Sequence, residues 1–286
     1  MEKTFIDKVG TILSFLGAII SILNLLFPDM NLLMNNIIII LIILFFLTLA
    51  MFYFRAFKIK DRYVKGVDEL KKLHQEIILL QNQIKDVNEN NFSQPLHQIC
   101  HKISKIFTKL RGEQICACIK YINATNNGEY YVQSLCRDAD SIERDKLLRP
   151  INTDKDYIHN NSDFSLIIND IAENVAREKI FFFSNNLPKE YGYLNSHLNE
   201  KKIRNLFLRS KHWPLPYKST IIVPVISVTK QPKDSALYAF FCIDCTKTKA
   251  FEKTTDIAIL QAISLQLFPV IEYVCNKYLI KNERRK

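Results

Sequence analysis

The chain has 286 residues, of which 48% are hydrophobic, and a formal net charge of +10. This length accommodates one domain of ordinary size with attached segments. The positive charge is typical of proteins that contact nucleic acid or an anionic membrane, and two long apolar segments favour the membrane. Seven cysteines lack the spacing of a small disulfide scaffold, which argues against a secreted, cross-linked protein and predicts reduced thiols in a cytoplasm.

Residues 1–57 are expected to form a two-helix transmembrane anchor. Val9–Phe27 and Ile37–Phe54 are uncharged apolar segments, each near the length that crosses a bilayer. The loop Pro28–Asn36 between them has no Lys or Arg, whereas five basic residues follow the second segment: Arg55, Lys58, Lys60, Arg62 and Lys65. The positive-inside rule therefore predicts a multi-pass protein of the inner (cytoplasmic) membrane with both termini in the cytoplasm. A signal peptide is the alternative for the first segment.

Residues 58–91 are expected to form a helical connector. Apolar residues recur alternately every three and four positions: Leu70, Leu73, Ile77, Leu80, Ile84 and Val87. Such a heptad seam favours a parallel two-stranded coiled coil, and therefore a homodimer. The alternative is one long amphipathic helix that packs on its own domain, because the seam is short.

Residues 92–286 are expected to form one domain, which begins with a helix over Pro95–Gly112. Its apolar face consists of Leu96, Ile99, Ile103, Ile106, Phe107 and Leu110. Ile115–Asn123 and Glu129–Arg137 follow as strands, joined by turn-forming residues 124–128.

The middle of this domain is expected to contain one helix and one strand. The charged segment 138–162 shows no strong periodicity and predicts irregular structure. A helix over Phe164–Ala176 follows, with Ser162 or Asp163 as its cap, and Ile180–Phe183 is the next strand.

A long excursion, Asn185–Pro216, precedes a hairpin of two strands and a final helix over Thr255–Tyr278. The hairpin strands, Thr220–Ile226 and Ala236–Ile243, do not alternate between apolar and polar residues, which predicts central strands covered on both faces. Pro224 cannot donate a ladder hydrogen bond, so a bulge and an adjacent pocket are expected beside it.

At this hairpin the chain resembles a GAF domain, a small-molecule-binding sensory module of many signalling proteins. The resemblance covers Phe92 to Tyr278 and is carried by the order Tyr217-x-Ser219-Thr220, Ile221–Val225, Cys242-Ile243-Asp244, Phe251 and the closing helix, with Asn152-Thr153-Asp154 and Ser184-Asn185 upstream. It implies an α+β fold: a central antiparallel sheet, the first and last helices on one face, and the middle helix and the excursion over the ligand side.

Catalytic and metal-binding constellations are weak. His97, Cys100 and His101 share one helix turn but have no accompanying carboxylate. Four further thiols, Cys116, Cys118, Cys242 and Cys245, favour buried structural cysteines, because positions i and i+3 of a strand face opposite ways. Only six glycines, with no phosphate-binding loop, argue against Walker, Rossmann and kinase sites. The sequence therefore predicts no enzyme, no catalytic residue, no cofactor and no metal site.

A basic cluster lies in the excursion just before Trp213: Lys201, Lys202, Arg204, Arg209, Lys211 and His212. It could recognise a phosphate-bearing ligand such as a nucleotide, or it could be a solvated loop near the inner leaflet. Cyclic-nucleotide GAF domains carry a Phe-x-x-x-Asp-Glu signature. Here Phe251 is followed by Thr255-Asp256, which argues against a cyclic nucleotide.

The resemblance places the ligand between the sheet and the excursion. The candidate ligand-binding residues are Asn185, Tyr193, Asn195, Trp213, Ser219 and Asp244. Trp213 could stack a flat ligand, or it could fill the space together with Tyr193. Asp244 could instead hold the following turn through an Asx-type hydrogen bond.

Together these features predict a bacterial inner-membrane sensory protein, a dimer whose cytoplasmic GAF-like domain binds a small molecule. The expected partners are the lipid bilayer, a second copy of the chain, an unidentified ligand such as a nucleotide, and a downstream protein, with no nucleic acid. One alternative is a nucleotide-activated two-span effector that permeabilises the membrane, as in some anti-phage systems. The other is an interaction module with an empty pocket.

Overall fold

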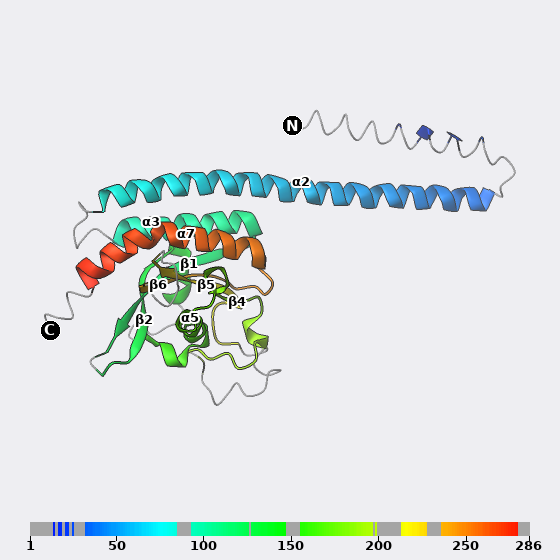
Figure 1. Ribbon diagram of the computed structural model, residues 1–286. Coiled ribbons are helices and arrows are strands. Elements are labelled where there is room, and N and C mark those ends of the chain that lie inside the picture. Colours follow the sequence, from blue (N-terminus) through cyan, green and yellow to red (C-terminus); the bar gives the residue numbers. More distant parts are fainter. Residues whose placement is uncertain are drawn as a thin grey trace. The chain divides into compact units, whose positions relative to one another are not determined.

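The computed structural model describes residues 32–84, 93–125, 127–146, 155–196, 213–227 and 236–279, with Leu198 and scattered positions between 14 and 25 (Figure 1). The first apolar segment, Val9–Phe27, and the heptad position Val87 therefore lie wholly or largely outside the described residues. Contacts divide the chain into two units, Met1–Tyr63 and Val64–Lys286.

One long helix, α2 (Leu32–Gln83), contains the whole second apolar segment. From Ile39 onward it is long and apolar enough to cross a membrane, and none of its most apolar window is buried. Phe45 is 59% and Phe52 is 70% exposed, which is unusual for a surface in water. Helix α7 (Lys253–Val274) passes the same test, but half of its window is buried, as in the core helix of a domain.

The connector part of α2 packs on the chain's own domain. Leu73 and Ile77 are each 1% exposed, and Glu69 and Glu76 form ion pairs with α3 (Ser93–Arg111). Gln81 Nε2 donates to the carbonyl of Gln266 in α7 over 2.5 Å. The chain itself thus covers the buried positions of the heptad seam, as the alternative of one long packed helix expects. The long helix is also consistent with a coiled coil, and the coiled coil and the homodimer stay predictions.

Helix α3 buries the apolar face that its periodicity predicts. All six residues of that face are at most 5% exposed: Leu96, Ile99, Ile103, Ile106, Phe107 and Leu110. The helix begins at Ser93, two residues before Pro95, and ends where Gly112 takes a φ of 73°. That left-handed conformation suits glycine because it has no Cβ.

Six antiparallel strands form one sheet in the order β3-β2-β1-β6-β5-β4. Their bounds are β1 Ile115–Ala124, β2 Tyr130–Arg137, β3 Asp156–Tyr157, β4 Phe182–Ser184, β5 Ser219–Ile226 and β6 Leu237–Cys245. Every residue of β5 is buried, which confirms the prediction of a strand covered on both faces. Pro224 pairs with Phe240 in regular register. The register shift falls between Val225 and Ile226, and its extra residue is Tyr238 of β6, so the bulge predicted within β5 at Pro224 is not present there. Pro224 itself is buried and lines no described pocket.

Two regions differ from the sequence predictions. Helix α4 (Ala139–Lys146), strand β3 and a 3-10 turn (Ile158–Asn160) occupy the segment that was expected to be irregular. Helix α5 (Ser162–Ala172) begins after Asn161, not after Ser162 or Asp163, and ends four residues before Ala176. The Asp163 carboxylate accepts a hydrogen bond from the next amide instead of capping the helix.

The elements are arranged in three layers (Figure 1). Helices α3 and α7 cover one face of the sheet through contacts with β1, β5 and β6, and α5 packs over β4 and β5. Two 3-10 turns, Arg177–Lys179 and Leu187–Lys189, flank β4, and α7 continues past Pro269 into π-helical Cys275–Leu279. The order helix, two strands, helix, strand, excursion, two strands, helix is the GAF-like order that the resemblance implies, and that fold prediction is confirmed.

Candidate functional site: a cationic cavity beside α5

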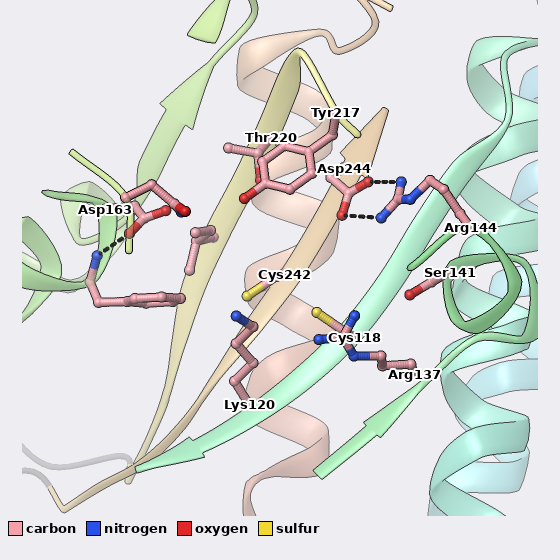
Figure 2. Close-up of a pocket in the computed structure, with 13 residues that line it drawn as sticks. Cys118, Lys120, Arg137, Ser141, Arg144, Asp163, Tyr217, Thr220, Cys242 and Asp244 are labelled. Carbon is pink, nitrogen blue, oxygen red and sulfur yellow. Dashed lines mark hydrogen bonds and ion pairs between the residues drawn. The ribbon is translucent and has the colours of Figure 1, made fainter. Parts of the chain in front are cut away.

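A small cavity opens on the sheet face that α5 covers (Figure 2). It is partly open to solvent, and its volume is about 30 Å³, which accommodates roughly two or three water molecules. Three basic side chains line it together with two carboxylates, two thiols and six other residues: Lys120, Arg137, Arg144, Asp163, Asp244, Cys118, Cys242, Ser141, Phe164, Asn195, Tyr217, Thr220 and Ile222. This concentration of buried charge distinguishes the cavity from the apolar core around it.

An ion pair between Arg144 and Asp244 closes one end of the cavity. The Nη1 and Nη2 atoms of Arg144 lie 2.5 and 3.3 Å from Oδ1 and Oδ2 of Asp244, a two-pronged arrangement visible in Figure 2. The side chains are 16% and 13% exposed, and the guanidinium lies 5.9 Å from the centre of the Tyr217 ring. A guanidinium presented in this way can hold a carboxylate or a phosphate with two parallel hydrogen bonds.

Asp138 fixes the position of Arg144 relative to the sheet. Its buried carboxylate accepts from the amide of Ala117 in β1 over 2.6 Å and from the amide of Ser141 over 3.0 Å. The second bond satisfies an amide in the first turn of α4, as an N-terminal cap does. Helix α4 is therefore tied to β1, and Arg144 follows Ser141 by about one turn on the side that reaches Asp244.

Lys120 contributes the cation in the middle of the cavity. Its Nζ atom lies 2.5 Å from Oδ2 of Asp156 and 5.3 Å from the centre of the Phe164 ring. Burial has the largest single effect and lowers the pKa of Lys120, but Asp156, Cys118 and Cys242 together outweigh it and hold this pKa above its usual value. Lys120 is thus a buried positive charge at neutral pH.

Asp163 lies at the N-terminal end of α5, and burial raises its pKa to about 6. Lys120, the amide of Phe164 and the hydroxyl of Tyr193 each favour the charged form, yet they only partly offset the loss of water. Tyr193 donates to Asp163 Oδ2 over 3.0 Å. Asp163 therefore titrates close to neutral pH.

Only two of the six predicted ligand-binding residues line the cavity, Asn195 and Asp244. Tyr193 lies one layer behind, where it bonds to Asp163 and packs 6.4 Å from Trp213 between ring centres. Trp213 Nε1 donates to the carbonyl of Tyr217 over 2.6 Å. The two aromatic rings therefore belong to the packed cover, as the alternative for these residues anticipated.

Asn185 and Ser219 hold the turn between β6 and α7. Asn185 donates to the carbonyl of Phe251 over 2.8 Å and accepts from its amide over 3.1 Å. Ser219 donates to the carbonyl of Lys247 over 2.7 Å. Both side chains thus bind backbone within the domain, and neither lines the cavity.

Sequence reasoning missed the three cations and Asp163. Lys120 offered a signal, because it interrupts an apolar run that predicts a buried strand, and a charge at such a position needs a partner or a ligand. Arg137 and Arg144 offered none, since each lies among other charged residues in the chain.

The other constellations are not assembled as metal or ligand sites. His97 Nδ1 lies 2.7 Å from the carbonyl oxygen of Arg137, while Cys100 Sγ lies 3.2 Å from Cys136 Sγ. Among the described residues, no group of three or more His, Cys, Asp or Glu side chains is placed to hold a metal ion. The basic cluster Lys201–His212 lies outside the described residues.

No protein-family model and no curated protein matches this chain. Among solved structures, a GAF domain covers 70% of this chain and 87% of its own length, with 13% identity and a TM-score of 0.42. The GAF domain of an Acinetobacter phosphoenolpyruvate-protein phosphotransferase covers 76% and 98%, with 14% identity and a TM-score of 0.40. A free methionine-R-sulfoxide reductase from Thermoplasma acidophilum covers 64% and 96%, with 11% identity and a TM-score of 0.39.

These similarities concern the fold, which is GAF-like, and identities this low carry nothing about ligand or reaction. The prediction that this chain is not an enzyme stays a prediction.

Proposed function

We propose that the chain is a membrane-anchored sensor whose GAF-like domain binds a small anionic molecule in the cavity beside α5. The observation that carries this function is the convergence of Lys120, Arg137 and Arg144 on one small cavity. Basic side chains are costly to bury, and three of them around one cavity favour an anion as the natural occupant.

Asp244 lies where the anionic group of the ligand would bind Arg144. Its two oxygen atoms meet the Arg144 guanidinium as a bound carboxylate or phosphate would. An incoming anion exchanges with Asp244, so it does not have to overcome the desolvation of a bare cation. Tyr217 and Thr220 supply an aromatic face and a hydroxyl beside this exchange point.

The small volume of the cavity makes ligand entry dependent on movement. A space of about 30 Å³ is far below the several hundred that ligand pockets commonly have. The ligand must therefore displace side chains, and Arg144 and Tyr217 are the ones at the closed end. Because α4 carries Arg144 and is tied to β1, this displacement is the event that the sensor reports.

Helix α2 is suited both to anchor the chain in the membrane and to transmit the signal from the ligand-binding domain. The same continuous helix contains the exposed apolar stretch from Ile39 and the connector packed on α3. A change in the packing of α3 on β1 alters the surface on which the connector rests. The signal then leaves through α2 or through a downstream protein that recognises the rearranged connector.

The function is tested with the full chain in detergent micelles by a thermal-shift panel. The panel contains inorganic phosphate, mononucleotides, cyclic nucleotides and dicarboxylates, and a compound at about 100 times its Kd should stabilise the folded state by about 2.7 kcal/mol. Arg144→Gln should weaken the best compound at least about tenfold, as expected for the loss of a charged hydrogen bond. Asp244→Asn should keep or strengthen binding, because it removes the competing carboxylate.

Lys247→Gln is the matched control, since the Lys247–Glu113 pair is a largely exposed ion pair of the same domain. It should leave the affinity unchanged. A panel without any stabilising compound, or an Arg144→Gln variant that binds as the wild type does, contradicts an anion site in this cavity.

The exposed apolar half of α2 also fits a second function, the nucleotide-activated membrane effector. Release of a dye from liposomes that contain the full chain, on addition of the stabilising compound, identifies an effector. A stabilising compound that causes no release identifies a sensor that acts through a partner.

A further inference from the structure

Two thiols face each other across the sheet at the cavity. Cys118 of β1 and Cys242 of β6 are directly paired in the antiparallel register, and both line the cavity. Each is 6% exposed, and Figure 2 shows their sulfur atoms on the same side of the sheet as the Lys120 amine. The ligand site described above does not need these thiols.

The register of the strands suits a disulfide without backbone movement. Directly opposed residues of an antiparallel pair have Cα atoms about 4.5 or 5.5 Å apart, and their side chains leave the sheet on one face. A disulfide accepts Cα separations of about 4.4–6.8 Å. The two cysteines therefore satisfy the spacing through strand pairing alone.

The surroundings favour a thiolate at Cys118. A hydrogen bond from the Cys242 thiol lowers the pKa of Cys118, and the positive charges of Arg137 and Lys120 act in the same direction against the effect of burial. Burial raises the pKa of the Cys242 thiol well above its usual value. The surroundings thus favour Cys118 over Cys242 as the nucleophile of the pair.

A second pair of thiols provides an internal comparison. Cys100 of α3 and Cys136 of β2 lie 3.2 Å apart between their sulfur atoms, but they are 0% and 2% exposed and line no described cavity. Burial raises the pKa of Cys100. Proximity alone would select this pair for oxidation, whereas thiolate character and access select Cys118 and Cys242.

We propose that Cys118 and Cys242 form a peroxide-sensitive thiol pair that closes to a disulfide across β1 and β6. The Cys118 thiolate attacks one oxygen of hydrogen peroxide, and the O–O bond breaks. The hydroxide that leaves takes up the proton released when the Cys118 thiol ionised and becomes water, while Cys118 becomes a sulfenic acid. The Cys242 sulfur then displaces the hydroxyl group, which leaves as a second water with the thiol proton. The two thiols lose two electrons, and hydrogen peroxide is reduced to two waters.

Closure of the pair changes the chemistry of the cavity. It replaces two thiol side chains by one bridge that cannot ionise, so neither sulfur can carry a negative charge beside Lys120. The three basic side chains of the cavity remain. Formation of the disulfide can be tested by itself, because it does not require a known ligand.

The test uses the full chain in detergent, treated with increasing hydrogen peroxide, alkylated and mapped by peptide mass spectrometry. The expected first product loses two hydrogen atoms and contains a cross-link between the peptides of Cys118 and Cys242. Dithiothreitol should reverse it. Cys100→Ser should form the same cross-link at the wild-type rate, while Cys118→Ser should form none.

Lys120→Met should slow the cross-link about tenfold, because it removes a cation that favours the thiolate. Lys102→Met is its control, since Lys102 of α3 pairs with Glu76 of α2, away from the cavity, and is more exposed than Lys120. The inference is overturned if the first cross-link joins Cys100 to Cys136. It is also overturned if Cys118 and Cys242 remain reduced at a peroxide concentration that oxidises free cysteine, or if oxidation of Cys118 ends at the sulfinic acid without a cross-link. The mapping of the wild-type chain decides these outcomes even where a variant fails to fold.

Discussion

The face of the sheet that carries α3 and α7 and the face that carries the cavity share the same strands but bury different side chains. The helical face is filled by apolar residues such as Phe107 and Leu260, both 0% exposed. Its buried ion pair joins Arg111 at the end of α3 to Asp256 at the start of α7, and Asp256 also accepts from the amide of Glu252. Charge on this face fastens two helices together.

The cavity face uses charge differently. Lys120, Arg137 and Arg144 converge on a space with room for water, and the carboxyl of Asp163 is desolvated enough to raise its pKa to about 6. Burial of these charged groups lowers the stability of the fold, whereas the apolar side chains under α3 and α7 carry no such cost. The comparison indicates that one face holds the fold and that the other is kept polar for binding.

The largest effect should follow from Phe107→Ala on the helical face. The ring is 0% exposed, and removal of a buried phenylalanine costs about 3–5 kcal/mol of unfolding free energy. Denaturant unfolding of the full chain, followed by circular dichroism, measures it. Tyr191→Ala, at an 89% exposed aromatic residue, is the control and should change little. A loss below about 1 kcal/mol for Phe107→Ala would show that the helical face does not carry the fold.

The next effect has the opposite sign and belongs to the cavity face. Because the pKa of Asp163 rises from 3.8 to about 6 on folding, the folded state holds a proton that the unfolded state has lost between these values. Its contribution to stability falls as the pH rises through this window and is constant above it, by about 3 kcal/mol in total. Asp163→Asn should therefore stabilise the protein by up to this amount at pH 7.5 and have little effect at pH 4.

Unfolding curves of Asp163→Asn and wild type between pH 4 and pH 8 give the difference directly. The asparagine oxygen can still accept from Tyr193, which keeps the variant close to native geometry. Leu166→Ala, at a 46% exposed residue of α5 without an ionisable group, should show no such pH dependence. A destabilised Asp163→Asn variant at pH 7.5 would mean that the charge of Asp163 supports the fold.

A smaller loss is expected at the contact between the connector and α3. A Cβ atom on Gly66 would lie 2.3 Å from Cδ2 of Leu110, so Gly66→Ala forces the leucine to move. Overpacking of this kind costs about 1–3 kcal/mol. The double variant with Leu110→Ala should show a favourable coupling energy in a double-mutant cycle. Additive effects would contradict close packing of α2 on α3.

The smallest effect should come from the cap of α7. The Glu252 carboxylate accepts from the amides of Thr254 and Thr255 over 3.2 and 2.6 Å. Glu252→Ala should cost about 1 kcal/mol at neutral pH. Hydrogen bonds from Thr255 lower the pKa of Glu252, so this stability is present above pH 4.5 and is lost as the pH falls through the folded value. The stability contribution of Glu252 therefore rises with pH, whereas that of Asp163 falls. Contributions that change in the same direction with pH would contradict the comparison.

The helical face could be predicted from the sequence because it depends on local periodicity. The apolar stripe from Leu96 to Leu110 and the runs of β5 and β6 are regular patterns that report burial directly. The heptad seam from Leu70 was also recognised as a buried stripe. The surface that covers this stripe could not be identified, because the same apolar pattern can pack against a second copy of the chain or against the chain's own α3.

The cavity could not be predicted, because its pairs are remote in sequence and follow no period. Lys120 meets Asp156 across 36 residues, and Arg144 meets Asp244 across 100. Asn195 and Asp244 were found only through the resemblance, which located the ligand side of the fold. Helix α4 was missed because its charged sequence shows no apolar stripe, whereas Asp138 fixes it through hydrogen bonds.

Hydrogen exchange of the full chain, with and without the most stabilising compound of the anion panel, tests the division between the two faces most directly. The account predicts protection confined to α4, to the β5 segment around Thr220 and to the end of β6 around Asp244, with exchange in α3 and α7 changed less. It also predicts that, at a compound concentration near the wild-type Kd, Arg144→Gln loses most of this protection, because the variant binds at least about tenfold more weakly. Protection centred on α3 and α7, or protection in Arg144→Gln equal to that of the wild type at this concentration, would contradict an anion site on the cavity face.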